Sequence, residues 1–204
     1  MTYHKAVLLT ECIEGLNIKP NGIYVDVTFG GGGHSIGILK HLVDGKLFAF
    51  DRDDDVLENI PNDKNLKLIQ TNYKNIKRFL RSEGVAKVDG ILADLGVSSH
   101  QFDVAERGFS FRFESELDMR MNKSSLLSAR KVVNEYSEED LANLFFKYGE
   151  IRISRKVAEL IVLAREEKEI VTTTDLLEIL DGVVPEKRRN QFLSQVFQSI
   201  RIEV

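Results

Sequence analysis

Short apolar runs and helical spacing alternate along the first half of the chain. Four runs rich in Ile, Val, Leu and Phe have the length of buried β-strands. Between them, apolar residues recur three or four positions apart, as they do in helices that cover a sheet. The expected strands are 23–27, 46–50, 66–69 and 88–94, and the expected helices are 8–16, 35–42 and 73–82. This alternation predicts an α/β fold with a parallel, doubly wound sheet.

The second half of the chain has a different pattern. Residues 96–122 show little periodicity, and so long a loop is usually functional or disordered. From Leu126 onward, apolar positions repeat at helical spacing. They are Leu141/Leu144/Phe145/Tyr148, Ile153/Val157/Leu160/Ile161/Ala164, Leu176/Leu177/Leu180 and Phe192/Val196/Ile200. We expect an α/β domain over 1–108 and a mostly helical domain over 109–204, with the boundary near Gly108.

Composition and charge exclude several classes of protein. The 28 Lys and Arg against 32 Asp and Glu give a net charge of −4, which excludes a wholly polycationic surface but not a local basic face. Hydrophobic residues make up 43% of the chain, enough for a packed core. The single cysteine excludes an intramolecular disulfide, and four histidines without paired spacing indicate no metal site. No apolar stretch approaches roughly 18 residues, and no signal-peptide pattern is present, so we expect no membrane partner and a cytoplasmic location.

Candidate binding residues follow three of the expected strands. The turn 28–34, with four glycines, comes after the first strand, and glycine lets a backbone approach a ligand closely. Asp51 ends the second strand, where a carboxylate can accept both ribose hydroxyls of a nucleoside. Asp94 ends the fourth. Because ligands of open α/β sheets bind at the carboxyl ends of the strands, these groups predict a nucleoside-binding site.

The spacing of the glycines discriminates between cofactors. Gly32 and Gly37 have P-loop spacing, but Ile38 and Leu39 follow in place of Lys and Ser/Thr. The dinucleotide fingerprint fits poorly, because Ser35 or Ile36 occupies its third glycine position. An NAD-dependent oxidoreductase therefore remains as a weaker alternative. The D-x-x-x-G-x-G spacing from Asp26 instead resembles motif I of methyltransferases that use S-adenosyl-L-methionine (AdoMet).

Longer motifs carry a more specific resemblance. They lie at 4–9, 26–35, 51–53, 88–99, 105–111, 117–121 and 148–150. With these motifs the chain resembles the bacterial 16S rRNA cytosine-N4 methyltransferase family, known as RsmH or MraW. The resemblance implies AdoMet-dependent methylation of a cytidine in the decoding site of small-subunit ribosomal RNA.

The resemblance also implies which residues contact AdoMet. Mapped onto this sequence, they are Gly32, Gly33, His34, Asp51, Tyr73, Asp94 and Gln101. Tyr73 stands where the family often has Phe and keeps a flat ring for the adenine, while His100 stands where Pro is frequent. We expect His34 to contribute its backbone more than its imidazole.

The resemblance covers the chain up to its last motif, 197–204. Family members continue beyond this motif and complete the sheet with later strands. We therefore expect a Rossmann-like class I AdoMet methyltransferase sheet, incomplete at its C-terminal strands, plus a helical second domain that recognises the substrate. The alternative is a relative that binds RNA or the ribosome without turnover.

The chemistry requires a proton acceptor, because the exocyclic amine of cytosine is a poor nucleophile. Asp94 is the candidate at the rim, although it fits the role of a pure cofactor ligand equally well. The target cytidine must also leave its stack. The loop offers aromatic and basic side chains that suit RNA, although we expect at least two of the phenylalanines to pack against the core. These are Phe102, Phe109, Phe111 and Phe113, with Arg107, Arg112 and Arg120.

Overall fold

The computed structural model describes residues 6–204, apart from the side chains of Glu58, Ser99 and His100. Residues 1–5 therefore lie outside the described part, and they include the start of the 4–9 motif. The side chain of His100, which stands where Pro is frequent in the family, also lies outside it. Packing divides the chain into two units, one up to Ser98 with Met121–Lys123, the other containing Ser99–Arg120 and Ser124–Val204.

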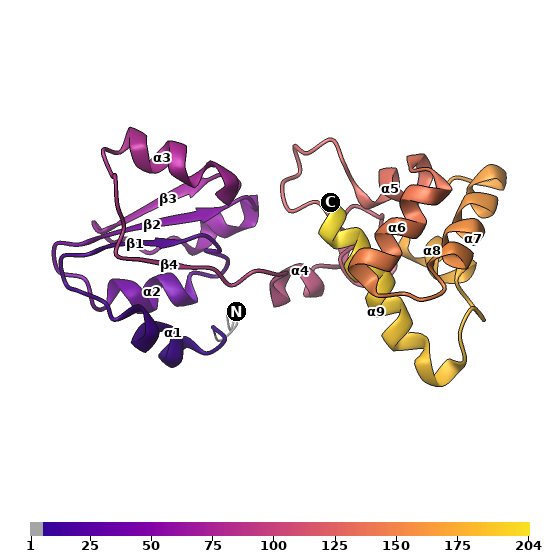
Figure 1. Cartoon of the computed structure of the whole chain (residues 1–204), viewed down its shortest axis with the longest axis horizontal. Helices are drawn as coiled ribbons and strands as arrows, with labels where there is room; N and C mark the ends of the chain where they lie inside the picture. The colour runs from indigo at the N-terminus through magenta and orange to yellow at the C-terminus, as the bar shows by residue number, and fades with distance from the viewer. Residues whose placement is uncertain (1–5) are drawn as a thin grey trace. The chain divides into compact units, whose positions relative to one another are not determined.

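The first unit is built on a four-stranded parallel sheet with the order β3-β2-β1-β4 (Figure 1). The strands are β1 (Ile23–Asp26), β2 (Lys46–Asp51), β3 (Leu66–Gln70) and β4 (Gly90–Leu92). All four expected strands are confirmed. The last is shorter than expected because the Asp94 N–H bonds the Thr28 hydroxyl (2.8 Å) instead of continuing the ladder.

Helices cover both faces of this sheet, as Figure 1 shows. Tyr24 of β1 packs on one face with Ile38 and with side chains of α1 (Leu9–Leu16) and α2 (Gly33–Leu39). The next residue, Val25, points to the other face and joins the cluster that contains Leu80 of α3 (Ile76–Ser82). This alternation along β1 is what makes the sheet doubly wound. Short 3-10 helices η1 (Asp54–Asn59) and η2 (Tyr73–Asn75) complete the unit, and η2 takes the first turn of the expected helix 73–82.

The second unit is helical. Its elements are α4 (Ser99–Asp103), η3 (Ala105–Arg107), α5 (Ala129–Glu135), α6 (Glu138–Gly149), α7 (Ser154–Glu167), α8 (Thr173–Ile179) and α9 (Glu186–Glu203). Helix α6 packs against both α7 and α9, and the expected apolar positions Phe145, Val157 and Val196 are fully buried. Ile153 differs from the expectation and is exposed, because it precedes α7 as its N-cap. The sheet and the helical unit together confirm the expected fold class.

Residues 99–108 pack with the helical unit, although the sequence placed the boundary near Gly108. The Arg107 carbonyl accepts a hydrogen bond from the Met119 N–H (3.0 Å), and the Arg107 side chain is buried. Arg201 of α9 donates to the Phe109 carbonyl (2.8 Å) and lies over the Phe102 ring. These contacts tie the start of the loop to α9, so the division after Ser98 follows from side-chain packing that periodicity does not reveal.

No helix within residues 6–204 is long and apolar enough to cross a membrane. The same residues contain no group of three or more His, Cys, Asp or Glu side chains arranged to hold a metal ion.

Candidate cofactor site

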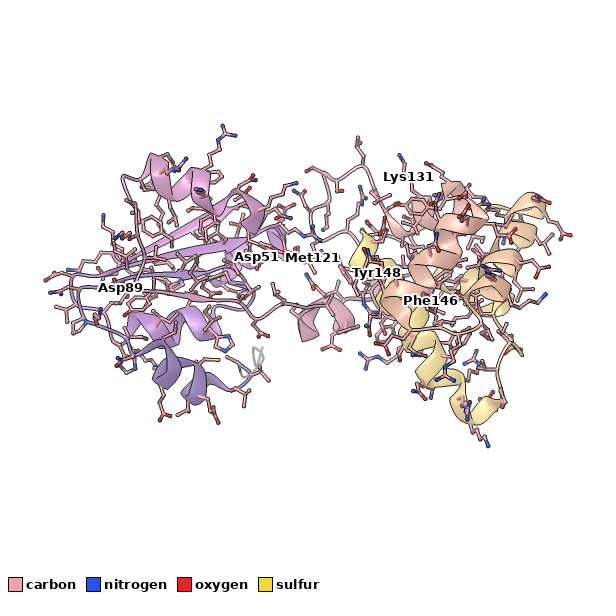
Figure 2. All side chains as sticks on the ribbon, viewed as in Figure 1. Asp51, Asp89, Met121, Lys131, Phe146 and Tyr148 are labelled. Carbon is pink, nitrogen blue, oxygen red and sulfur yellow. The ribbon has the colours of Figure 1, made fainter. Side chains whose placement is uncertain are left out.

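The site lies at the carboxyl ends of the strands, where parallel pairing aligns several of the expected residues. The register pairs Asp26 of β1 with Ala49 of β2 and with Leu92 of β4. The residues that follow, Thr28, Asp51 and Asp94, therefore share one rim of the sheet. Figure 2 shows Asp51 at this end and Asp89 at the opposite end of the sheet. Asp89 has a structural role there, because it accepts hydrogen bonds from the Ile23 N–H and the Lys19 ammonium.

Asp26 holds the glycine turn through hydrogen bonds from residues at its start and end. Its carboxylate is fully buried and accepts hydrogen bonds from the Thr28 N–H (3.0 Å), the Thr28 hydroxyl (3.3 Å) and the Ser35 hydroxyl (2.8 Å). Burial raises the pKa of Asp26, and the hydrogen bonds oppose that rise. The side chain faces the protein rather than a ligand. Its role is therefore to fix the turn. The sequence motif includes Asp26 but does not indicate this role.

The turn itself requires glycine at two positions. Gly30 and Gly32 have φ values of 50° and 76°, the left-handed region that other residues avoid. A Cβ at Gly32 would also lie 3.1 Å from the Phe29 ring, and one at Gly33 would lie 2.9 Å from the Ala6 Cβ. The turn is bare backbone that leads into α2, and added side chains would fill it.

Asp51 connects the second strand to this turn. One carboxylate oxygen accepts the Gly30 N–H (2.8 Å) and the other accepts the Asp53 N–H (3.0 Å). Burial raises the pKa of Asp51, and these backbone hydrogen bonds oppose that rise. Asp51 also receives a backbone hydrogen bond from Arg52. Because an ionised carboxylate offers about four acceptor positions, capacity remains for a donor such as a ribose hydroxyl.

Asp94 is tied to the same turn through its backbone. Its N–H donates to the Thr28 hydroxyl, which in turn donates to Asp26, so one threonine joins the ends of β1 and β4. The Asp94 side chain is 51% exposed, and one oxygen lies 3.9 Å from Nδ1 of His34. The Asp94 carboxylate is therefore accessible to a ligand, while its backbone is fixed by the hydrogen bond to Thr28.

His34 uses its imidazole as well as its backbone. The residue is 6% exposed in the first turn of α2, and Nε2 lies 2.9 Å from the Val7 carbonyl oxygen. Nothing in the sequence pattern predicts this contact, because Val7 lies far from His34 along the chain.

Tyr73 and Gln101 complete the expected set in different units. Tyr73 begins η2, just after β3, and is half-exposed (50%). Gln101 lies in α4 of the helical unit, where its side chain is buried. The α/β unit thus holds Gly32, Gly33, His34, Asp51, Tyr73 and Asp94.

The loop residues expected to face RNA divide into buried and exposed groups. Phe109 is buried, and Phe111 packs edge-on against Phe197 with 5.4 Å between ring centroids. The expectation that at least two of the phenylalanines pack against the core is confirmed. Phe113 remains exposed, with the Arg112 guanidinium 5.8 Å from its ring centroid.

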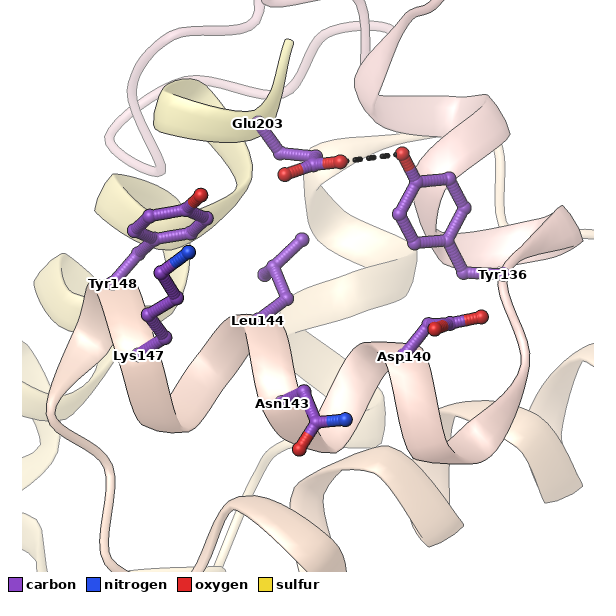
Figure 3. Close-up of a pocket in the computed structure, with 7 residues that line it drawn as sticks. All are labelled: Tyr136, Asp140, Asn143, Leu144, Lys147, Tyr148 and Glu203. Carbon is purple, nitrogen blue, oxygen red and sulfur yellow. Dashed lines mark hydrogen bonds between the residues drawn. The ribbon is translucent and has the colours of Figure 1, made fainter.

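A separate hollow of about 400 Å³ opens in the helical unit (Figure 3). The Tyr136 hydroxyl donates to Glu203 there (2.6 Å), and burial together with this carboxylate raises the pKa of Tyr136 to about 12. None of the residues expected to bind AdoMet lines it. The lining residues are Tyr136, Asp140, Asn143, Leu144, Lys147, Tyr148 and Glu203.

Comparison with known proteins places the whole chain in one family. The family model described as the MraW methylase family matches residues 1–204. A protein of Flavobacterium johnsoniae named ribosomal RNA small subunit methyltransferase H is 58% identical over 100% of this chain and 68% of its own length. Proteins of the same name from Christiangramia forsetii and Bacteroides fragilis are 53% and 52% identical over 100% of this chain, and the chain covers 68% and 67% of them.

These matches decide between the cofactors that the sequence left open. They contradict the NAD-dependent oxidoreductase alternative and confirm a methyltransferase, whose methyl donor is AdoMet. The bare turn at Gly32 and the carboxylate of Asp51 beside it fit a nucleoside with a compact tail. The chain belongs to the MraW methylase family.

Proposed function

We propose that this protein methylates N4 of a cytidine in the decoding site of small-subunit ribosomal RNA. The observation that carries the proposal is the match over the full chain, at 50–58% identity, to proteins named ribosomal RNA small subunit methyltransferase H. The cytidine and its N4 atom come from the motif resemblance, and the rim of the sheet offers groups suited to that chemistry.

The chain's own residues divide the binding of AdoMet among them. Gly32 and Gly33 offer bare backbone to the amino-acid tail, and Asp51 accepts hydrogen bonds from the ribose hydroxyls. Tyr73 offers a half-exposed ring on which the adenine stacks. We assign further contacts to His34, Asp94 and Gln101 on the motif resemblance.

Asp94 is the proposed catalytic residue. When bound, AdoMet supplies an electrophilic methyl group for an in-line displacement, in which positioning is decisive. The amine lone pair of cytosine is delocalised into the ring, so a hydrogen-bond acceptor on its N–H makes the nitrogen more nucleophilic. The half-exposed carboxylate of Asp94 can accept that hydrogen bond and then the proton.

The helical unit is the proposed site of RNA recognition. Two exposed basic clusters, Arg152/Arg155/Lys156 and Lys187/Arg188, lie at the starts of α7 and α9. Lys156 lines a hollow with Asp181, and Arg189 beside the second cluster pairs with the same Asp181 (3.6 Å). One member or neighbour of each cluster therefore lies beside Asp181. A basic face of this kind binds phosphates. The proposed partner is the small ribosomal subunit, and the proposed location is the cytoplasm.

Transfer of a labelled methyl group tests this proposal. The 204-residue chain is incubated with labelled AdoMet and small ribosomal subunits that lack the modification, and the RNA is digested for mass spectrometry. We expect label in N4-methylcytidine from the decoding site. Subunit binding without transfer would favour the alternative, a relative that binds the ribosome without turnover. Asp94→Asn separates the two roles of Asp94, since a catalytic role predicts lost transfer with AdoMet binding retained.

A further inference from the structure

We propose that the His34 imidazole is a positioning residue that forms a hydrogen bond with Asp94 once the cytosine amine has released its proton. This inference rests on the proposed function. It assigns a role to the buried imidazole of His34. Contacts between the His34 backbone and the cofactor would not need this imidazole.

The hydrogen bond to Val7 determines which ring nitrogen of His34 carries hydrogen. A backbone carbonyl can only accept, so the 2.9 Å contact requires a proton on Nε2. In the neutral ring, Nδ1 then carries a lone pair. The ring cannot easily exchange its two nitrogens, because Ala6 and Val7 lie against the first turn of α2 and the residue is 6% exposed.

The free lone pair faces a carboxylate. Nδ1 lies 3.9 Å from an oxygen of Asp94, and both atoms are acceptors when His34 is neutral and Asp94 is ionised. At this distance they form no hydrogen bond, and a proton on either atom would let the two side chains approach and form one. The buried Asp26 of β1 also interacts electrostatically with His34. The ring thus has two acids near it, Asp26 at the end of β1 and Asp94 just after β4.

Methyl transfer supplies such a proton. The N4 lone pair of cytosine forms a bond to the methyl carbon of AdoMet, and the carbon–sulfur bond breaks with its electron pair remaining on sulfur. The nitrogen then carries one proton more than the neutral product. That proton passes to Asp94, where Nδ1 of His34 shares it, and it leaves to water through the exposed side of the carboxylate when the product departs.

Two variants separate the two contacts of the ring. His34→Gln places an amide near the position of Nε2 and can keep the bond to Val7, but it removes the base at Nδ1. His34→Asn places an amide near Nδ1 and loses the bond to Val7. His41→Gln, an exposed histidine that follows α2, is the matched control.

The first measurement is single-turnover methyl transfer as a function of pH. We expect His34→Gln to lower the single-turnover rate constant about a hundredfold, the lower end of what a positioned proton acceptor contributes, with the dissociation constant of AdoMet changed less than about twofold. The pH dependence of the rate should differ between wild type and His34→Gln, because the variant removes the base at Nδ1. His34→Asn should weaken AdoMet binding as well as turnover, and His41→Gln should change neither. A wild-type rate and pH profile in His34→Gln, or equal losses of AdoMet affinity and turnover, would overturn the proposal.

A second measurement does not depend on activity. Nitrogen NMR of the imidazoles, with His34 assigned by its loss in His34→Gln, reports the tautomer and the hydrogen bond at Nδ1. We expect a proton on Nε2 in the neutral ring and a changed Nδ1 signal in Asp94→Asn. A proton on Nδ1, or a signal insensitive to Asp94→Asn, would refute the pairing. If the pairing holds but no methyl reaches the ribosomal RNA, the proposed function fails and the geometry stands.

Discussion

Two carboxylates at neighbouring strand ends have different roles because their partners differ. Asp26 has its hydrogen bonds filled by Thr28 and Ser35 within the protein. Asp51 accepts a backbone N–H on each oxygen but is only partly buried, so it can also accept from a ligand. Both follow an apolar strand in the sequence, so only their partners distinguish the residue that builds the turn from the one that binds.

Replacing Asp51 tests its proposed contact with the ribose. We expect Asp51→Ala to weaken AdoMet binding by about 1–3 kcal/mol, because charge-assisted hydrogen bonds are lost. Titration calorimetry measures this, and Asp44→Ala, at an exposed acid in the same unit, should leave the affinity unchanged. Unchanged affinity in Asp51→Ala would show that other groups hold the ribose.

Gly108 is required for a second reason besides its backbone angle. Its φ is 66°, and an added Cβ would lie 2.2 Å from the Glu116 carbonyl oxygen. Gly182 in the same unit has a φ of 70° but open space around it. The two positions share the cost of a left-handed backbone, and only Gly108 adds a clash with backbone.

We therefore expect Gly108→Ala to lower the free energy of unfolding of the helical unit more than Gly182→Ala does. The left-handed conformation costs about 1–2 kcal/mol in both variants, and forced repacking adds about 1–3 kcal/mol at Gly108. Urea unfolding followed by circular dichroism measures the difference. Equal losses would contradict the close approach to Glu116.

At the scale of elements, α8 begins at a reciprocal cap. The Thr172 hydroxyl accepts the Asp175 N–H (3.0 Å), and the Asp175 carboxylate accepts the Thr172 N–H (2.8 Å). The hydrogen bond from Lys168, followed by those from Thr172, lowers the pKa of Asp175. A carboxyl group with a lowered pKa in the folded state stabilises that state above its ordinary pKa of 3.8, and the contribution is lost as the pH falls toward the folded value.

The stability of the helical unit should consequently depend on pH through Asp175. We expect Asp175→Asn to cost about 1 kcal/mol at neutral pH, the usual value of an N-terminal cap. The difference from wild type should shrink as the pH falls below 3.8. Urea midpoints between neutral and acidic pH measure it, and a constant difference would show that the charge contributes nothing.

Apolar periodicity predicted most helices and strands because each buries one face. The four strands and the stripes on α6, α7 and α9 are where the pattern placed them. The pattern did not reveal α4 and η3, which lie in the loop with little periodicity. The first of them is contacted from a distant part of the chain, because the Arg201 guanidinium of α9 lies over the Phe102 ring of α4.

At the scale of the whole molecule, the chain consists of two packed units with separate cores. Six of the seven residues expected to contact AdoMet lie in the α/β unit. A ligand that binds only the folded state stabilises the part that holds it. Binding should therefore affect the two units unequally.

We expect AdoMet at a hundredfold excess over its dissociation constant to stabilise the α/β unit by about 2.7 kcal/mol. The helical unit should gain less. Amide signals from each unit, followed by NMR during urea unfolding with and without AdoMet, report the two gains separately. Equal gains would show that the units unfold as one or that the helical unit holds most of the cofactor.

The sequence by itself determined the strand–helix alternation, the bare glycine turn, the carboxylate that ends β2 and the one that follows β4. Each depends on local periodicity or on residue type at one position. Tertiary structure decided that Asp26 faces inward, that Thr28 joins two strand ends, and that His34 lies between Val7 and Asp94. The contacts of Thr28 and His34 with Asp94 join residues that are distant along the chain, and they form only when the strands pair.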